Sequence, residues 1–313
     1  MIVIRDIEDI RGTLRGACAT IGNFDGVHKG HQKLIARTRD KALTNRQECV
    51  VITFEPHPLR VLAGKNTPPF ITLLDQKLEL ISAMGVELCV VLEFSRCMAA
   101  LTPDDFVRRY LVDGLNVKEL VIGYDYAFGK GRSGNFEVLS ELGLKYGFGV
   151  ERVGPYMHGD AIVSSTRIRD LVRAGNVWDA RPLLGRFYTV VGKVEHGANR
   201  GGRLLGFPTA NLKLVDELCP GMGVYAVWAT VGGRTMPAVA NIGYNPTFGN
   251  EAMSVEVHIM DFEADLYGAD LTVRFVQRLR SERKFDGLDQ LTEQIAKDIS
   301  LARTILASSD AQI

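Results

Sequence analysis

The sequence lacks an excess of charge of either sign, because its 37 lysines and arginines are matched by 37 aspartates and glutamates. A strongly basic nucleic-acid-binding protein and a polybasic membrane-surface protein are therefore disfavoured. Cysteine is also scarce: the five cysteines form no Cys-x-x-Cys pair, which disfavours a disulfide framework and a zinc site. Reduced thiols of this kind are typical of the cytoplasm, where we expect the protein to be located.

Long apolar runs are missing as well. Segments such as Cys49–Phe54 and Leu88–Leu92 have the length of a strand and are far shorter than a membrane span. The first fifteen residues alternate charged with apolar side chains and lack the apolar stretch of a secretory signal. We therefore expect no membrane association. The chain has 313 residues, of which 46% are hydrophobic and 24% charged, so it can form two globular domains.

Up to about residue 184, apolar segments alternate with amphipathic ones, which predicts strands separated by helices. The strands are expected at Ala17–Ile21, Cys49–Phe54, Leu88–Leu92, Glu119–Ile122 and Gly149–Val153. The helices are expected at Lys29–Leu43, Leu74–Met84, Pro103–Leu111 and Asn135–Tyr146. Fully apolar strands joined by helices indicate a Rossmann-like parallel sheet covered on both faces, and we assign it to residues 1–184. Ligands of such sheets bind at the carboxyl ends of the strands.

The second half, residues 185–313, has a different pattern of short alternating strands separated by turns rich in glycine and proline. The strands are expected at Tyr188–Val194, Val224–Val231, Met236–Ile242, Ser254–Met260 and Leu271–Val276. Closely spaced strands of this kind predict a small antiparallel β-barrel. A helix with one apolar face, Leu288–Leu306, closes the chain. The domain boundary is expected near Arg181–Arg186.

The first predicted strand runs into Gly22–His31, with the sequence GNFDGVHKGH, and a helix follows. The glycines let the backbone approach a ligand closely, and the free N–H groups of the helix start can bind an anion. His28 and His31 are three residues apart, so both can face one phosphate there. A plain helix cap or a metal site stays open as an alternative for the two histidines.

Two further segments fit a nucleotide site. Phe54–Pro58 follows the second predicted strand, where its two prolines stiffen a ligand wall, although His57 itself could equally belong to a structural turn. Ser164–Arg169 opens a later helix, and its hydroxyls and guanidiniums suit a polyphosphate. Alone, this segment would be an ordinary helix cap, but its presence beside the histidine motif favours phosphate binding.

The barrel half opens with a glycine-rich stretch at residues 197–206, which includes Gly201 and Gly206. It lacks the Gly-Lys-Ser/Thr ending of a Walker A motif, although its backbone amides can still wrap phosphates. Thr209 and Asn211 follow two residues apart, so in an extended segment both side chains face the same side and can bind one Mg²⁺. A plain hairpin connection stays open as an alternative.

These motifs resemble those of the bifunctional bacterial riboflavin kinase/FAD synthetases. Gly22–His31 and Ser164–Arg169 resemble the adenylyltransferase half, which belongs to the His-x-Gly-His nucleotidyltransferase superfamily. Gly123–Gly129 resembles a third characteristic turn of the adenylyltransferase half, although Tyr126 and Ala127 differ from the side chains that are usual there. GRLLGFPTANL resembles the riboflavin kinase signature, and further kinase segments are similar to 241–248, 254–260, 265–268 and 279–285. The resemblance covers almost the whole chain.

The resemblance implies two ATP-dependent reactions that Mg²⁺ serves: riboflavin is phosphorylated to FMN in the barrel, and FMN is adenylylated to FAD in the N-terminal domain with release of pyrophosphate. It implies that Thr209 and Asn211 hold Mg²⁺ and that Glu256 is the catalytic base, although the strand pattern alone would make this residue merely solvent-facing. A ribityl hydroxyl needs such a base, whereas the phosphate of FMN, with a second pKa near ~6, is already anionic. His28 and His31 are the implied catalytic residues at the α-phosphate of ATP.

The resemblance also implies a set of binding residues for the nucleotides and flavins. They are Gly22, Asn23, Phe24, Asp25, Phe54, Pro56, His57, Pro58, Asp125, Ser164, Ser165, Thr166, Arg169, Gly201, Gly206, Pro208 and Asn241.

Three other functions fit the sequence less well. A nucleotidyltransferase of another specificity with an appended barrel is disfavoured by Glu256 and by the Pro-Thr-Ala-Asn motif. A non-catalytic flavin-binding regulator should have lost His28, His31, Asn211 or Glu256, and all four are present. An RNA-binding barrel would need a basic, aromatic strand face. The expected partners are therefore small molecules, with no nucleic acid and no membrane, and a transient homo-oligomer is left open.

Overall fold

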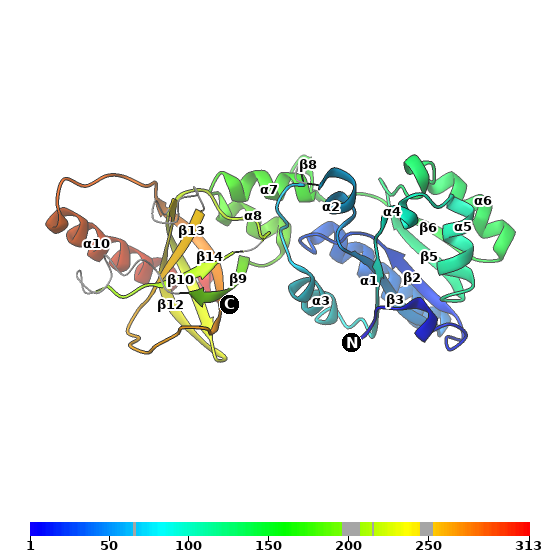
Figure 1. Ribbon diagram of the computed structural model, residues 1–313, viewed down its shortest axis with the longest axis horizontal. Helices are drawn as coiled ribbons and strands as arrows, with labels where there is room; N and C mark the ends of the chain where they lie inside the picture. The colour runs from blue at the N-terminus through cyan, green and yellow to red at the C-terminus, as the bar shows by residue number, and fades with distance from the viewer. Residues whose placement is uncertain (65–66, 196–206, 215, 245–252) are drawn as a thin grey trace. The chain divides into compact units, whose positions relative to one another are not determined.

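The computed structural model describes residues 1–64, 67–195, 207–214, 216–244 and 253–313 (Figure 1). These residues form two compact units. The first comprises Met1–Pro68 and Thr72–Ser164, and the second comprises Pro69–Ile71 and Ser165–Ile313. Within the described ranges, every helix is too short or too polar to cross a membrane.

The first unit is built on a six-stranded sheet with parallel pairing throughout, in the order β1-β4-β3-β2-β5-β6. The strands are β1 (Ile2–Ile4), β2 (Ala17–Ile21), β3 (Glu48–Glu55), β4 (Leu88–Glu93), β5 (Val117–Gly123) and β6 (Gly149–Val153). Strands β3 and β4 lie on one side of β2, and β5 and β6 lie on the other. The strand order therefore reverses at β2, which is where ligands bind in sheets of this type, outside the carboxyl ends of the strands.

Helices cover both faces of this sheet. They are α1 (Lys29–Asn45), α2 (Pro58–Ala63), α3 (Leu74–Ser82), α4 (Arg96–Ala99), α5 (Pro103–Phe106) with the π-helical turn η3 (Val107–Val112), and α6 (Phe136–Tyr146). Two 3₁₀ turns, η1 (Ile7–Asp9) and η4 (Lys130–Arg132), and a hairpin of β7 (Met157–His158) and β8 (Ala161–Ile162) complete the unit. Alternate residues of each central strand enter different cores: Ala17 and Ala19 of β2 join the core under η3 and α6, whereas Cys18 joins the core under α1 and α3. This arrangement confirms the predicted parallel sheet buried on both faces.

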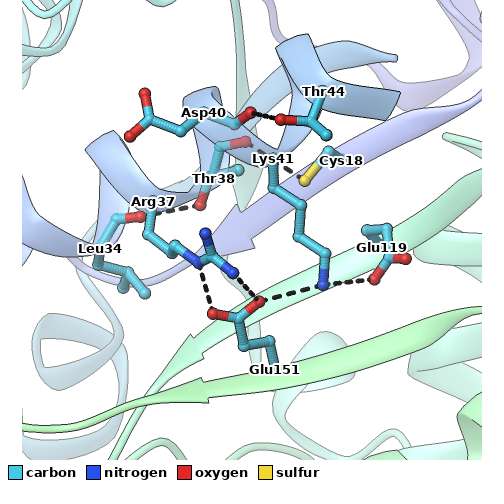
Figure 2. A network of polar contacts seen from close by, with 9 residues as sticks. All are labelled: Cys18, Leu34, Arg37, Thr38, Asp40, Lys41, Thr44, Glu119 and Glu151. Carbon is cyan, nitrogen blue, oxygen red and sulfur yellow. Dashed lines mark hydrogen bonds and ion pairs between the residues drawn. The ribbon is translucent and has the colours of Figure 1, made fainter. Parts of the chain in front are cut away.

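A network of charged side chains fastens α1 to the sheet, as Figure 2 shows. The Lys41 ammonium lies 2.8 Å from a carboxylate oxygen of Glu119 on β5 and 3.1 Å from one of Glu151 on β6. Arg37 donates two hydrogen bonds to Glu151. A Cβ on Gly149 would lie 2.4 Å from the Glu119 carboxylate, so a larger residue there would displace this carboxylate. The network fixes the C-terminal half of the helix whose N-terminus carries the histidine motif.

The second unit is a closed antiparallel barrel in the order β10-β13-β12-β11-β14-β9, in which β9 and β10 also pair. Its strands are β9 (Tyr188–Glu195), β10 (Ala210–Lys213), β11 (Gly223–Val231), β12 (Arg234–Tyr244), β13 (Met253–Ile259) and β14 (Asp270–Arg280). The helices are α7 (Ser165–Arg173), α8 (Val177–Leu184) and α10 (Leu288–Leu306), followed by the 3₁₀ turn η6 (Ser309–Ala311). Ala302 and Leu306 of α10 pack with Val224 and Val239 of the barrel. The predicted barrel and its closing helix are thereby confirmed.

Candidate active sites

The histidine motif lies directly after β2 and forms the start of α1. His28 caps the helix: its Nδ1 accepts a hydrogen bond from the N–H of His31 at 3.3 Å. The two rings stack with 3.6 Å between their centroids, and the Phe24 ring meets His31 edge-on at 5.3 Å. A Cβ on Gly30 would lie 3.0 Å from the His28 ring, so the glycine between the histidines gives this ring its space. The structure thus brings His28 and His31 together at one helix N-terminus, as the sequence predicts.

The electrostatic environment of His31 decides how it can act. Burial first, and then the charges of His28 and Lys77, lower the pKa of His31 well below its ordinary value. The ring is therefore neutral at pH 7 and offers a hydrogen bond instead of a full positive charge. Its Nδ1 is buried and has no hydrogen-bond partner among the described residues. A buried polar atom without a partner is unusual in a folded protein, and it fits a position that a ligand completes.

Asp25 belongs to the segment Gly22–His31 that carries the histidine motif, and only 3% of its surface is exposed. Its Oδ1 accepts a hydrogen bond from the Thr72 N–H at 3.1 Å, and the Thr72 hydroxyl accepts one from the Gly26 N–H at 2.9 Å. The Asp25 carboxylate is therefore engaged in holding the loop to the segment before α3. A contact between Asp25 and a bound ligand stays a prediction.

Lys77 of α3 is a residue that the sequence analysis missed. It is 4% exposed, and burial lowers its pKa while the nearby carboxylates of Asp25 and Glu55 oppose that shift. Its charge also acts on His31. A signal was present in the sequence, because this lysine takes a position on the apolar face of the predicted helix, between Leu74 and Ile81.

The carboxyl ends of β3 and β5 carry the next two predicted segments. After β3, the Glu55–Pro56 peptide bond is cis, and the His57 Nδ1 accepts a hydrogen bond from the Leu59 N–H at 3.1 Å, which caps α2. Phe54 is buried at the end of the strand. Asp125 is exposed in the turn that follows β5. Since β2 lies between β3 and β5, these segments and the histidine loop share one edge of the sheet. Their contacts with a nucleotide or flavin stay predictions.

The segment Ser164–Arg169 is divided between the units. The Val163 carbonyl oxygen lies 3.7 Å from the position that a Cβ on Gly30 would take, so the chain leading into Ser164 runs beside the histidine loop. Ser165 and Thr166 begin α7 in the second unit. Arg169 is 8% exposed, and its Nε donates a hydrogen bond to the Pro69 carbonyl at 3.2 Å. The phosphate-binding role of these residues stays a prediction.

The barrel brings three predicted residues into one row. Asn211 on β10 and Asn241 on β12 are the direct cross-strand partners of Glu256 on β13, from either side. Directly opposed residues of antiparallel strands share a face, so the three half-buried side chains are neighbours. Burial raises the pKa of the Glu256 carboxyl. The predicted base therefore lies next to a predicted metal ligand and is made more basic by its surroundings.

Thr209 and Pro208 are exposed in the segment that leads into β10, whereas Gly201 and Gly206 lie outside the described residues. The Thr209 hydroxyl and the Asn211 amide are oxygen donors of the kind that Mg²⁺ prefers. Within the described part of the chain, no group of three or more His, Cys, Asp and Glu could hold a metal ion. Two neutral oxygen donors suit an ion that takes its other ligands from nucleotide phosphates and water.

Comparisons with known proteins agree with this geometry. Residues 10–167 match the model of the FAD synthetase family, and residues 184–306 match the model of the riboflavin kinase family. The bifunctional riboflavin kinase/FMN adenylyltransferase of Escherichia coli (strain K12) is 38% identical over 305 residues, which are 97% of each chain. The protein of the same description from Bacillus subtilis (strain 168) is 41% identical over 283 residues, 89% of each. A crystal structure from Streptococcus pneumoniae, described as a macrolide-efflux protein, superimposes with a TM-score of 0.86 at 34% identity and covers 96% of this chain and 98% of its own.

Proposed function

Because the chain belongs to the family of bifunctional riboflavin kinase/FMN adenylyltransferases, we propose a division of its two reactions between specific residues of the two halves. The protein is an enzyme that phosphorylates riboflavin to FMN and adenylylates FMN to FAD, with ATP as the second substrate of both steps. The order of the halves is that of the family, with the FAD synthetase half first. We place the functional boundary between residues 184 and 185.

For the kinase step, Glu256 accepts the proton of the terminal ribityl hydroxyl as the hydroxyl oxygen attacks the γ-phosphorus of ATP and ADP leaves. The observation that carries this role is the row formed by Asn211, Glu256 and Asn241 across three adjacent strands. Thr209 and Asn211 would hold Mg²⁺, which neutralises charge on the phosphates when it is bound. Because burial raises the pKa of Glu256, the carboxylate takes up a proton more readily than an exposed one would.

For the adenylylation step, a phosphate oxygen of FMN attacks the α-phosphorus of ATP and pyrophosphate leaves. The nucleophile is an anion at neutral pH, because the second pKa of a phosphate monoester is near ~6, so no general base is required. The protein has to stabilise the negative charge that spreads over the reacting phosphate. The stacking of His28 and His31 at the start of α1 supports this role for the pair, which would act through hydrogen bonds and together with the helix dipole.

The remaining assignments belong to the same proposal. A cytoplasmic location is supported by the five cysteines, each of which is a free thiol. Small molecules are the partners that the two reactions require. The lack of a nucleic-acid partner and a transient homo-oligomer stay predictions.

Product analysis of the purified chain tests the proposal. Riboflavin, ATP and MgCl₂ are incubated with the protein, and the products are separated by chromatography and identified by mass. We expect FMN first and FAD later, and FAD alone when FMN is supplied in place of riboflavin. A parallel reaction with the metal removed by a chelator should give neither product. FMN formation that continues without divalent metal would refute the role of Thr209 and Asn211, and a failure to form FMN in any condition would refute the assignment of the barrel.

A further inference from the structure

His258 lies on β13 two residues beyond Glu256, so the two side chains leave the strand on the same face. Its Nδ1 is 2.9 Å from the Pro208 carbonyl oxygen. The Phe207 ring meets the imidazole edge-on, with 5.6 Å between the ring centroids and 89° between their planes. Two contacts from one histidine therefore hold the two residues that precede Thr209.

The hydrogen bond defines the chemical state of the ring. A carbonyl oxygen has lone pairs and no proton, so the Nδ1 of His258 must be the donor. In the neutral imidazole this is the Nδ1–H tautomer, and Nε2 then carries no proton. The Pro208 nitrogen has no proton to donate. A hydrogen bond from β13 to the backbone of Pro208 must therefore use the Pro208 carbonyl.

One strand thus locates both predicted metal ligands. Asn211 is held by its cross-strand pairing with Glu256, and Thr209 follows directly on the carbonyl that His258 binds. Groups that orient metal ligands by hydrogen bonds affect metal affinity and activity almost as strongly as the ligands themselves.

We propose that His258 is a positioning residue for the riboflavin kinase reaction: its Nδ1–H holds the Pro208 carbonyl so that Thr209 lies beside Asn211 and can share one Mg²⁺ with it. This inference rests on the proposed function, because it takes Thr209 and Asn211 as the metal ligands. It assigns His258 no contact with the substrates. A merely structural histidine would change the stability of the barrel and leave the response to Mg²⁺ as it was.

Substitutions in the full-length chain separate these two roles. His258→Leu removes the donor and keeps an apolar side chain against Phe207, whereas His258→Asn places an amide N–H close to where Nδ1 lies. Ser254→Ala is the matched control, because Ser254 lies two residues before Glu256 and its hydroxyl donates to the Gly243 carbonyl of β12 at 3.3 Å. It removes a side-chain hydrogen bond from the same strand without touching the segment before Thr209.

FMN formation is then measured over a range of Mg²⁺ concentrations at fixed riboflavin and ATP. We expect His258→Leu to raise the apparent KM for Mg²⁺ about tenfold, with a smaller change in kcat. His258→Asn should restore most of the wild-type response, and Ser254→Ala should not change it. FAD formation from supplied FMN should be the same in all four proteins. An unchanged Mg²⁺ response in folded His258→Leu would overturn the proposal.

A measurement that does not depend on activity tests the hydrogen bond itself. In a long-range ¹H–¹⁵N spectrum of the ¹⁵N-labelled protein at alkaline pH, the His258 signals are those that His258→Asn lacks. We expect the pattern of an Nδ1-protonated ring, and an Nε2-protonated ring would overturn the proposal even if His258→Leu fails to fold. A wild-type protein that makes FMN without divalent metal would overturn the proposed metal-binding role of Thr209 and Asn211 and the His258 role together. Mg²⁺-dependent wild-type activity beside an unaffected His258→Leu variant would overturn the His258 role alone.

Discussion

Asn211 and Glu256 face each other directly across β10 and β13, although 45 positions separate them in the sequence. A metal ion bound to the Asn211 amide would lie next to the Glu256 carboxylate, which we propose as the base. Asn241 flanks the same carboxylate from β12. This placement couples the two requirements of phosphoryl transfer to an alcohol, a base for the hydroxyl and a cation for the phosphates, within one short row of side chains.

Replacing Glu256 with glutamine tests the base directly. Glutamine keeps the shape of the side chain but cannot accept the proton, so FMN formation from riboflavin should fall by about 100-fold or more. FAD formation from supplied FMN should continue, because that step needs no base. Both rates are followed by chromatography of the flavins. Glu293→Gln, on the exposed surface of α10, is the matched control and should leave both rates unchanged. Loss of both activities in Glu256→Gln would argue against separate sites.

The pH dependence of FMN formation should report the buried environment of Glu256. Burial raises the pKa of its carboxyl, and the group acts as a base only when it is deprotonated. The kcat/KM for riboflavin should therefore decline as the pH falls, and the decline should be centred above about 4.3, the ordinary pKa of a glutamate. A decline centred at or below that value would contradict the role of burial. Adenylylation should follow instead the phosphate of FMN, whose second pKa is near ~6.

Much of the fold could be predicted because the local signals were strong. Ala17–Ile21 and Gly149–Val153 were predicted with the bounds that the structure shows. The helix from Pro103 was predicted correctly at its start, where Thr102 caps it, but it passes into a π-helical turn after Phe106. Several elements were not predicted, among them β1 and α8. Strand β1 is an apolar run of only three residues, Ile2–Ile4, which is too short to show a strand pattern, and α8 contains a proline, which normally argues against a helix.

The sites were less predictable because they depend on tertiary pairing. The residue types at the ends of β2 and β3 could be read from the sequence, but the row of Asn211, Glu256 and Asn241 follows from strand register, which local patterns do not determine. Thr72 carries no signal of its own, since its role consists of two hydrogen bonds to a loop 46 or 47 positions away. The capping bonds of His28 and His57 likewise appear only in the folded chain.

Two substitutions of His28 separate its structural role from its chemical role. His28→Ala removes both the ring and the cap of α1, and it should lower stability by about 1 kcal/mol. His28→Asn keeps a good N-cap acceptor and should recover that stability, which can be read from hydrogen exchange of the α1 amides. Both variants should lose FAD formation by about 100-fold, so FMN should accumulate from riboflavin. Normal FAD output from His28→Asn would show that the cap is the sole contribution of this residue.

The buried charges under the histidine loop should be energetically coupled. Lys77→Met leaves the buried Asp25 carboxylate without the nearby cation, and Asp25→Asn leaves the Lys77 ammonium with one carboxylate fewer, that of Glu55 remaining. Each single change should destabilise the first unit, because an uncompensated buried charge is costly. The double variant should be more stable than the sum of the single effects predicts, by about 1–3 kcal/mol.

The probe for this double-mutant cycle of Lys77→Met and Asp25→Asn has to report the stability of the first unit. Both tryptophans, Trp178 and Trp228, belong to the second unit, so their fluorescence would follow the barrel half. Hydrogen exchange of the amides in β2 and β3 reads the correct unit in the full-length chain. Glu79→Gln, an exposed change on α3, gives the control cycle with Asp25→Asn, and its effects should add within about 0.5 kcal/mol. If Lys77→Met and Asp25→Asn were equally additive, the two charges would not interact.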